Sequence, residues 1–238
     1  MRVSVCVATF NGGLYVEEQL NSILAQLSLD DEVIVCDDQS SDDTLEKIAA
    51  INDRRIKIYV NTTNLGYVRN FERAVSLAEG DYLFLSDQDD VWPAGRLFKM
   101  LEAFEASRKS VVVGNFDVFT TGETGFRKYH ACLTGKYNRT GILNIIQMMK
   151  GGIPYFGCCM GFRKEFVKYY LPFPDPSVSH DIWLAIVSNF RGEIFHISDI
   201  VSHRRLHDTN ITIASRSLVK KIGTRLRWLR LLLRCHLA

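Results

Sequence analysis

Residues 82–92 read Tyr-Leu-Phe-Leu-Ser-Asp-Gln-Asp-Asp-Val-Trp, and this stretch decides the fold. Its first four residues, 82–85, form a short apolar and aromatic run, which is the pattern of a strand buried on both faces. Three carboxylates follow at once, those of Asp87, Asp89 and Asp90. Oxygen ligands grouped at the end of a strand suit a hard divalent cation. We therefore expect Mg²⁺ or Mn²⁺ among these carboxylates, of which Asp87 and Asp89, two residues apart, can face the same way from an extended segment.

The alternative for this acidic group is a solvated turn that binds no metal. In that case Asp90 caps a helix that begins near Pro93. The metal interpretation is favoured because carboxylates that are buried without a compensating charge are costly.

The residues before this stretch alternate between strand and helix patterns. That order predicts an α/β fold with a doubly wound, mostly parallel sheet and right-handed crossovers. The expected strands are residues 3–8, 32–36, 56–60 and 82–85, and the expected helices are residues 15–27, 40–51 and 68–78.

Polar residues follow these strands at the point where each one ends. Thr9 and Asn11 come after the first strand, and Asp38 comes after the second. Because ligands of such sheets bind beyond the carboxyl ends of the strands, we expect these residues to converge with Asp87 and Asp89. The sequence contains neither GxGxxG nor GxxxxGK[ST], which argues against a dinucleotide-binding fold and a P-loop enzyme.

Regularity weakens in the second half of the chain. We expect helices at residues 94–106, 142–149 and 181–189, a strand at residues 111–115, two short strands near residues 194 and 200, and an irregular segment at residues 120–139.

The charge is distributed unevenly along the 238 residues. From Arg216 onward there are seven basic residues and no acidic ones, so the rest of the chain has a net charge of −5. An acidic body argues against general nucleic-acid binding. The six cysteines show no CxxC spacing, and nowhere do about 18 apolar residues follow one another. With no signal-peptide pattern at the start, we expect a cytoplasmic protein.

Five segments, in this order, resemble the family-2 glycosyltransferases of the GT-A fold, over nearly all of residues 1–210. The form Ser-Asp-Gln-Asp-Asp-Val-Trp is typical of a rhamnosyltransferase-like branch that builds cell-surface polysaccharide. The resemblance implies a GT-A domain at residues 1–212, with a nucleotide-sugar-binding half at 1–115 and an acceptor half at 116–212. The segments are residues 4–11 (SVCVATFN), 33–44 (VIVCDDQSSDDT), 64–71 (NLGYVRNF), 86–92 (SDQDDVW) and 180–181 (HD).

The resemblance implies roles around a nucleotide-sugar. Asp38 would accept the imide N–H of uracil or thymine, and Thr9 and Asn11 would lie in the same donor-binding region. Asp89, with Asp87 beside it, would hold the metal that neutralises charge on the departing diphosphate. Asp87 would alternatively contact the ribose. For Asp38, an Asx-turn or a helix N-cap is the structural alternative.

By the same resemblance, Asp181 would be the general base. It would take the proton of an acceptor hydroxyl as the oxygen attacks the anomeric carbon from the face opposite the diphosphate, which inverts the configuration. The alternative is a carboxylate that only stabilises the first turn of a helix.

The stretch from His203 to Asn210 is similar to an Arg-x-His-x-x-Asn pattern of the branch, through Arg205, His207 and Asn210. His207 would meet the diphosphate or the metal, and Arg204 or Arg205 would neutralise phosphate. The alternative is that His207 has only a structural role.

Three residues are expected on the acceptor side. Gly157 and Cys158 fit the acceptor-side segment of the family, and Trp183 would stack on a sugar face. The alternative for Trp183 is a core aromatic, which is also the interpretation we favour for Trp92.

Residues 213–238 predict a basic amphipathic helix. One alternative is peripheral contact of residues 216–234 with the cytoplasmic face of an anionic membrane. The other is that its leucines pack on the catalytic domain. The apolar face comprises Leu218, Ile222, Leu226, Leu229 and Leu233, and the basic face comprises Arg216, Arg227, Arg230 and Arg234.

The sequence thus predicts an inverting glycosyltransferase. Its sugar donor would be a UDP- or dTDP-sugar, with dTDP-L-rhamnose suggested by the branch, and its acceptor a lipid-linked or cell-surface glycan precursor. One alternative is a sugar nucleotidyltransferase, although residues 9–13 lack the cation that such enzymes place there. The other is a non-catalytic nucleotide-binding module, although Asp38, Asp89 and Asp181 are all present.

Overall fold

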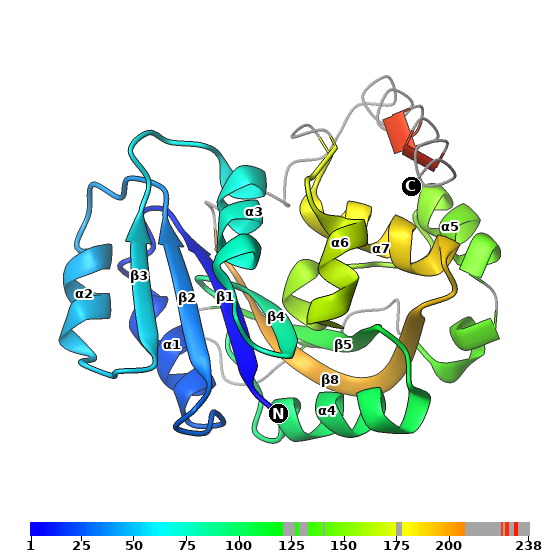
Figure 1. The fold of residues 1–238 in the computed structure, drawn as a ribbon, viewed down its shortest axis with the longest axis horizontal. Coiled ribbons are helices and arrows are strands. Elements are labelled where there is room, and N and C mark those ends of the chain that lie inside the picture. Colours follow the sequence, from blue (N-terminus) through cyan, green and yellow to red (C-terminus); the bar gives the residue numbers. More distant parts are fainter. Residues whose placement is uncertain are drawn as a thin grey trace.

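A single mixed sheet of eight strands forms the centre of the molecule, in the order β3-β2-β1-β4-β7-β5-β6, with β8 pairing with β5 (Figure 1). This computed structural model describes residues 1–120, 127–128, 133–139, 141–174 and 178–207, together with residues 225, 227, 228, 231 and 232.

The first four strands are parallel and adjacent, in the order β3-β2-β1-β4. They are β1 (Val3–Thr9), β2 (Glu32–Asp37), β3 (Ile56–Val60) and β4 (Tyr82–Asp87). Nearly every residue of β1, β2 and β4 is buried, because helices cover both faces of the sheet. The α/β fold class expected from the sequence is confirmed.

Three helices connect these strands: α1 (Val16–Leu24), α2 (Thr44–Ala50) and α3 (Tyr67–Leu77). Helix α1 packs beside α2, whereas α3 lies against β1 and β2 as it returns the chain from β3 to β4. Right-handed crossovers require this arrangement, since the direction of winding reverses between β3 and β4.

The second half of the chain completes the sheet. Strand β7 lies between β4 and β5 and is antiparallel to both, so the two expected halves share one sheet. The elements are α4 (Arg96–Ser107), β5 (Val111–Thr120), β6 (Arg127–Lys128), η1 (Gly135–Arg139), α5 (Gly141–Lys150), η2 (Gly157–Cys159), β7 (Met160–Arg163), η3 (Lys164–Phe166), α6 (Val167–Tyr170), α7 (His180–Phe190) and β8 (Ile194–Leu206).

The prediction of two short strands near residues 194 and 200 is wrong. The structure has one strand, β8, which runs parallel to β5 with register shifts on both sides of Asn115. The Asn115 side chain fills this irregularity, donating to the carbonyls of Leu133 and Ser198 at 3.0 Å each. The local sequence does not show this continuity, because Asn115, whose side chain bonds to the irregular part of β8, lies far away in the chain.

The last part of β8 reaches the acidic turn that follows β4. Val91 and His203 form an isolated antiparallel bridge with two backbone hydrogen bonds of 2.9 Å. This bridge places the residues that follow His203 beside the carboxylates of residues 87–90.

Most of the expected basic C-terminal helix lies outside the described residues. Of those described, Leu231 is 3 % exposed, and Trp228 and Leu232 pack against the core. The guanidinium of Arg225 donates to the carbonyl of Met149 in α5. At these positions the tail contacts the core and α5.

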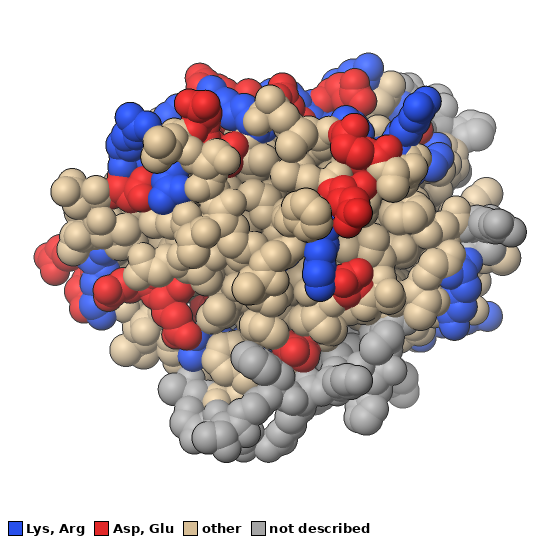
Figure 2. All heavy atoms as spheres, turned by 90° about the horizontal axis from the view of Figure 1, so that it is seen from below, with Lys and Arg blue, Asp and Glu red and all other residues tan. Residues whose placement is uncertain are grey.

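The described part of the chain contains no helix that is both long enough and apolar enough to cross a membrane. On the face shown in Figure 2, acidic and basic side chains of the described residues are interspersed, without a continuous basic field.

Candidate active site

The strand register brings the polar strand ends together. Thr9 lies opposite Asp37 in the β1–β2 pair, and Ala8 lies opposite Asp87 in the β1–β4 pair. The amide of Asp38 donates to the carbonyl of Thr9 at 2.8 Å. The residues that follow β1, β2 and β4 therefore converge at one edge of the sheet, as expected.

Thr9 is buried and shapes this edge from within. Its hydroxyl donates to Asp37 Oδ1 at 2.8 Å, and Asp37 also accepts from the amide and hydroxyl of Ser40, at 2.8 and 2.6 Å. This network fixes the turn after β2, so Thr9 positions the residues beside it.

Asp38 is 2 % exposed and anchors the segment that leads into α3. Its Oδ1 accepts from Asn61 Nδ2 and from the Leu65 amide, both at 2.7 Å, and its Oδ2 accepts from the Gly66 amide at 2.8 Å. A carboxylate offers about four acceptor positions, so these bonds leave Asp38 with one. These contacts are neither an Asx-turn nor a cap of the next helix, α2, whose N-cap is Asp43; they tie Asp38 to residues 61–66.

Asn11 links the loops after β1 and β2. Its backbone is left-handed, with φ 49°, a conformation that asparagine adopts more readily than most residues. Its amide donates to Ser40 Oγ at 2.9 Å, and its Oδ1 accepts from the Ser41 amide at 2.8 Å.

Gln88 was not singled out by the sequence, yet it ties the acidic turn to the loop after β1. The Phe10 amide donates to Gln88 Oε1 at 2.8 Å, and Gln88 Nε2 donates to the Phe10 carbonyl at 3.0 Å. A Cβ on Gly12 would lie 2.3 Å from Gln88 Oε1, so a larger residue there would displace the Gln88 side chain. The only signal for this role is the position of Gln88 between two acidic residues.

The expectation that Asp90 caps a helix is wrong. Helix α4 begins at Arg96, and Gly95 occupies its N-cap position without a side-chain cap. Asp90 is buried, accepts from the Arg205 amide at 3.2 Å, and has Arg204 Nε at 3.8 Å. It therefore belongs to the acidic cluster.

The cluster is short of positive charge. Burial, followed by the charges of Asp90 and Asp89, raises the pKa of Asp87 to about 8, and Asp181 contributes in the same direction. Burial also raises the pKa of Asp90 to about 6, although Arg204 opposes the rise. Convergent carboxylates that are hard to ionise are the environment that a divalent cation relieves, so these residues fit the expected metal.

His207 reaches this cluster from the end of β8. Its Nε2 lies 2.8 Å from Asp89 Oδ2, and its ring stacks on Tyr15 with centroids 4.9 Å apart. The structure thus places His207 beside Asp89, the residue that the resemblance gives as the metal ligand.

Asp181 lies in the first turn of α7, where its Oδ1 accepts from the Ile182 amide at 2.7 Å. Its side chain is partly exposed, and its charge acts on Asp87. Asp181 therefore lies near enough to the acidic cluster for its charge to raise the pKa of Asp87, although the two segments are far apart in the sequence.

His180, next to Asp181, is buried between aromatic rings. Its ring centroid is 4.1 Å from that of Phe71 and 6.4 Å from that of Phe173. Neither of its ring nitrogens has a hydrogen-bond partner among the described residues, and burial lowers its pKa. A Cβ on Gly157 would lie 2.5 Å from His180 Nε2, so η2 approaches α7 closely only because residue 157 is a glycine.

The acceptor-side residues are mostly buried. Gly157 and Cys158 lie in η2, which packs against β4. Trp183 is buried, and its indole donates to the Tyr170 carbonyl at 2.9 Å. This burial favours the core interpretation of Trp183. Trp92 is likewise buried, and it donates to Ser86 Oγ at 3.1 Å.

Arg205 already has partners within the protein. Its guanidinium pairs with Glu18 at 2.6 Å and donates to the Asp89 carbonyl at 3.1 Å. It therefore holds the acidic turn against α1, which leaves Arg204 as the arginine next to the cluster. Asn210 lies outside the described residues.

Comparison with known families agrees with this geometry. The sequence profile described as "Glycosyl transferase family 2" matches residues 4–171, well over half of the chain. The chain belongs to glycosyl transferase family 2.

Relatives of known description include enzymes of glycan synthesis. WfgD of Escherichia coli, a "UDP-Glc:alpha-D-GlcNAc-diphosphoundecaprenol beta-1,3-glucosyltransferase", is 24% identical over 88% of this chain and 79% of its own length. WfaP, an E. coli enzyme with the same description, is 30% identical over 60% of this chain and 63% of its own length. The "dTDP-rhamnosyl transferase RfbG" of Shigella flexneri is 38% identical, but over only 36% of this chain and 32% of its own.

Among solved structures, S. aureus TarS 1-349 in complex with UDP-GlcNAc has a TM-score of 0.72. The similarity covers 98% of this chain and 70% of that chain, at 19% sequence identity. This likeness confirms the GT-A fold.

Proposed function

We propose that this family-2 glycosyltransferase inverts configuration and uses a UDP- or dTDP-sugar as its donor. Its acceptor would be a hydroxyl of a lipid-linked or cell-surface polysaccharide precursor, and Mg²⁺ or Mn²⁺ would lie at Asp89 and Asp87. The observation that supports this proposal most is the acidic cluster at the carboxyl edge of the sheet, with His207, just after β8, in contact with Asp89 and the charge of Asp181 acting on Asp87.

The descriptions of the relatives indicate which sugar donor should be tested first. The two E. coli relatives, whose names give UDP-Glc, match 88% and 60% of this chain, whereas the dTDP-rhamnosyl transferase matches 36%. A UDP-sugar is therefore the first donor to test, and dTDP-L-rhamnose is the second. The same two names give a diphosphoundecaprenol-linked acceptor, which supports a lipid-linked acceptor here.

In the proposed reaction each residue has a limited task. Asp181 takes the proton of the acceptor hydroxyl; its side chain is partly exposed and lies near enough to the cluster for its charge to raise the pKa of Asp87. Asp89 and His207 would hold the metal, and Asp87 lies beside them. When bound, the metal supplies positive charge against the departing diphosphate. Asp38 and Thr9 order the loops after β1, β2 and β3, and so fix the part of the site that binds the nucleotide.

The position of the enzyme in the cell is part of the proposal. A lipid-linked acceptor would bring the chain to the cytoplasmic face of a membrane, where the basic residues of 216–234 would favour anionic lipid. The buried Leu231 and the contact between Arg225 and Met149 instead favour packing of the tail on the domain.

The proposal is tested with a screen of nucleotide-sugars that follows nucleotide release, with Mn²⁺ and with EDTA. We expect release with one UDP- or dTDP-sugar, its loss in EDTA, and a fall of about 10²- to 10⁴-fold for Asp181→Asn when acceptor is present. Asp199→Asn is the matched control, because Asp199 is an exposed carboxylate paired with Lys99.

Different outcomes remove different parts of the proposal. Release that survives EDTA unchanged would remove the metal, and equal rates for Asp181→Asn and Asp199→Asn would remove the base. Nucleotide-sugar binding without any turnover would favour the non-catalytic module.

A further inference from the structure

Helix α5 presents an apolar face to solvent. Ile142, Leu143 and Ile146 are 65, 58 and 41 % exposed, whereas Ile145 and Met148 of the same helix are buried against the core. Ile146 lies three and four residues after Leu143 and Ile142, so the three exposed side chains are neighbours on one side of the helix. Large apolar side chains that are exposed together, rather than singly, mark an interaction surface.

The segment that contains α5 carries positive charge and no negative charge. No Asp or Glu occurs between Glu123 and Glu165. Lys150, four residues after Ile146, is exposed at the end of α5, and Lys136 is exposed in η1, which contacts α5. Exposed apolar residues flanked by lysines are the composition of a helix that lies at the surface of an anionic membrane.

The tail brings a second segment without acidic residues to the same place. The Arg225 guanidinium donates to the carbonyl of Met149 in α5, and Arg227 is exposed. Figure 1 shows the described part of the tail next to α5, at the outer side of the molecule. Residues 209–238 contain seven Lys/Arg and no Asp or Glu. Two acid-free segments that are far apart in the sequence are therefore in contact.

These charges decide between two possible partners. A second copy of this chain that met the first through α5 would bring like charges together, which is costly at an interface. A surface of anionic lipid complements both the apolar residues and the cations. We propose that the α5 face, defined as Ile142, Leu143 and Ile146 with Lys136 and Lys150, docks on an anionic membrane, where its apolar side chains enter the boundary between headgroups and acyl chains.

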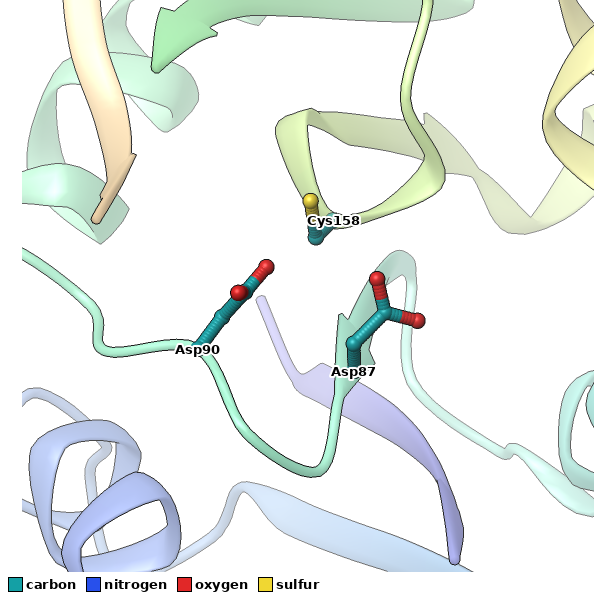
Figure 3. A group of neighbouring side chains, drawn as sticks. All are labelled: Asp87, Asp90 and Cys158. Atoms are coloured by element: carbon teal, nitrogen blue, oxygen red, sulfur yellow. The ribbon is translucent and has the colours of Figure 1, made fainter. Parts of the chain in front are cut away.

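The position of α5 gives this contact a use in sugar transfer. Asn144 Nδ2 of α5 donates to Asn189 Oδ1 of α7 at 2.8 Å, and α7 begins beside Asp181. The acidic cluster lies elsewhere: Figure 3 shows Asp87 and Asp90 converging with Cys158 of η2. Docking through α5 would hold the helix that carries the proposed base near the membrane. This use, unlike the docking itself, rests on the lipid-linked acceptor of the proposed function.

The test is sedimentation of the full chain with vesicles, without nucleotide-sugar or acceptor. We expect binding to vesicles of phosphatidylglycerol and phosphatidylcholine in roughly equal amounts, and much weaker binding to phosphatidylcholine alone. The triple variant Ile142→Ser/Leu143→Ser/Ile146→Ser should bind the anionic vesicles about tenfold or more weakly. The matched control is Leu29→Ser/Phe98→Ser, which removes two apolar side chains that are 70 and 71 % exposed in other parts of the surface and should bind like the wild type.

A charge variant provides an independent measurement. Lys136→Gln/Lys150→Gln should weaken binding to the anionic vesicles by roughly tenfold and reduce its dependence on salt. Because both lysines are exposed, this variant should fold normally. It therefore decides the question if circular dichroism shows that the triple variant is unfolded, and wild-type binding in the charge variant would then reject the proposal.

Other outcomes overturn the proposal in distinct ways. Wild-type binding by the folded triple variant would assign the lipid contact to the tail alone, and equal loss in Leu29→Ser/Phe98→Ser would show non-specific adhesion. A wild-type dimer that ignores vesicles and becomes a monomer in the triple variant would make a second copy the partner. Because no sugar donor is present, failure of vesicle binding leaves the transfer reaction untouched, and an enzyme without transferase activity would leave the vesicle result standing.

Discussion

His207 Nε2 lies 2.8 Å from Asp89 Oδ2, although 118 residues separate the two in the chain. The contact exists because β8 is one long strand whose end is fixed to the acidic turn by the bridge between Val91 and His203. The end of β8 thereby completes a site whose carboxylates follow β4, at the centre of the sheet.

The first prediction concerns this pair. His207→Ala should weaken Mn²⁺ affinity by about 10- to 100-fold, because a group that binds or orients a metal ligand is lost. The measurement is nucleotide release as a function of Mn²⁺ concentration, and excess Mn²⁺ should restore most of the rate. A Mn²⁺ dependence identical to that of the wild type would show that His207 is only structural.

The second prediction concerns Asp38. Asp38→Ala removes three hydrogen bonds to a buried carboxylate, which should lower the free energy of unfolding by roughly 2–4 kcal/mol. Asp30→Ala, at an exposed loop position, should change it by less than about 0.5 kcal/mol. Urea denaturation measures both, and equal effects would contradict the anchoring role. If Asp38 also contacts the base, Asp38→Asn should raise the KM for the sugar donor by a larger factor than its loss of stability can account for.

The third prediction concerns pH. The pKa of Asp87 is raised from 3.8 to about 8, so between these values the folded chain retains a proton that the unfolded chain has released. Stability attributable to this group therefore falls as the pH rises through that window. In EDTA, Asp87→Asn should melt at nearly the same temperature as the wild type at about pH 4 and several degrees higher at about pH 8.5.

A second buried group acts in the opposite direction but cancels from that comparison. Burial lowers the pKa of His196 to about 4, so its contribution to stability is lost as the pH falls below the ordinary histidine value of 6.5. Because His196 is present in both proteins, its contribution cancels from the difference between them. A melting-temperature difference that does not vary with pH would refute the raised pKa.

The fourth prediction concerns the approach of η2 to α7. Gly157→Ala would place a Cβ 2.5 Å from His180 Nε2, which should destabilise the fold by about 1–3 kcal/mol and slow transfer by shifting the residue next to Asp181. Gly135→Ala is the control, since its Cβ would meet its nearest neighbour at 3.9 Å. If the collision is the cause, the double variant Gly157→Ala/His180→Ala should be less destabilised than the sum of the two single variants.

The fifth prediction separates the two roles of the tail. Leu231 is buried, so Leu231→Ala should lower the free energy of unfolding by roughly 2 kcal/mol or more. Leu143→Ala, at an exposed position of α5, should have a much smaller effect. Unchanged stability of Leu231→Ala, together with weaker binding to vesicles of anionic lipid, would instead support the membrane role.

The first half of the fold could be predicted from the sequence because its information is local. The apolar runs of β1, β2 and β4 mark strands buried on both faces, and the crossover rule then sets their order. The convergence of Asp38 and Asp87 follows from that order alone.

The rest depends on contacts between distant residues. The Asn115 side chain bonds to the irregular part of β8, and Asp90 accepts from the Arg205 amide; neither contact leaves a periodic signal in the sequence. The sequence also could not show that Trp183 is buried, because a tryptophan beside an acidic motif fits a sugar platform and a core equally well.

The two hydrogen bonds between Gln88 and Phe10 have a consequence for engineering. In these bonds the side-chain amide of Gln88 pairs with the Phe10 backbone as the backbone of a neighbouring strand would. The acidic turn and the loop after the first strand should therefore move together. Exchanging either loop alone with a relative would break this joint, so altered sugar preference should be sought by transplanting residues 10–13 and 87–90 as a pair.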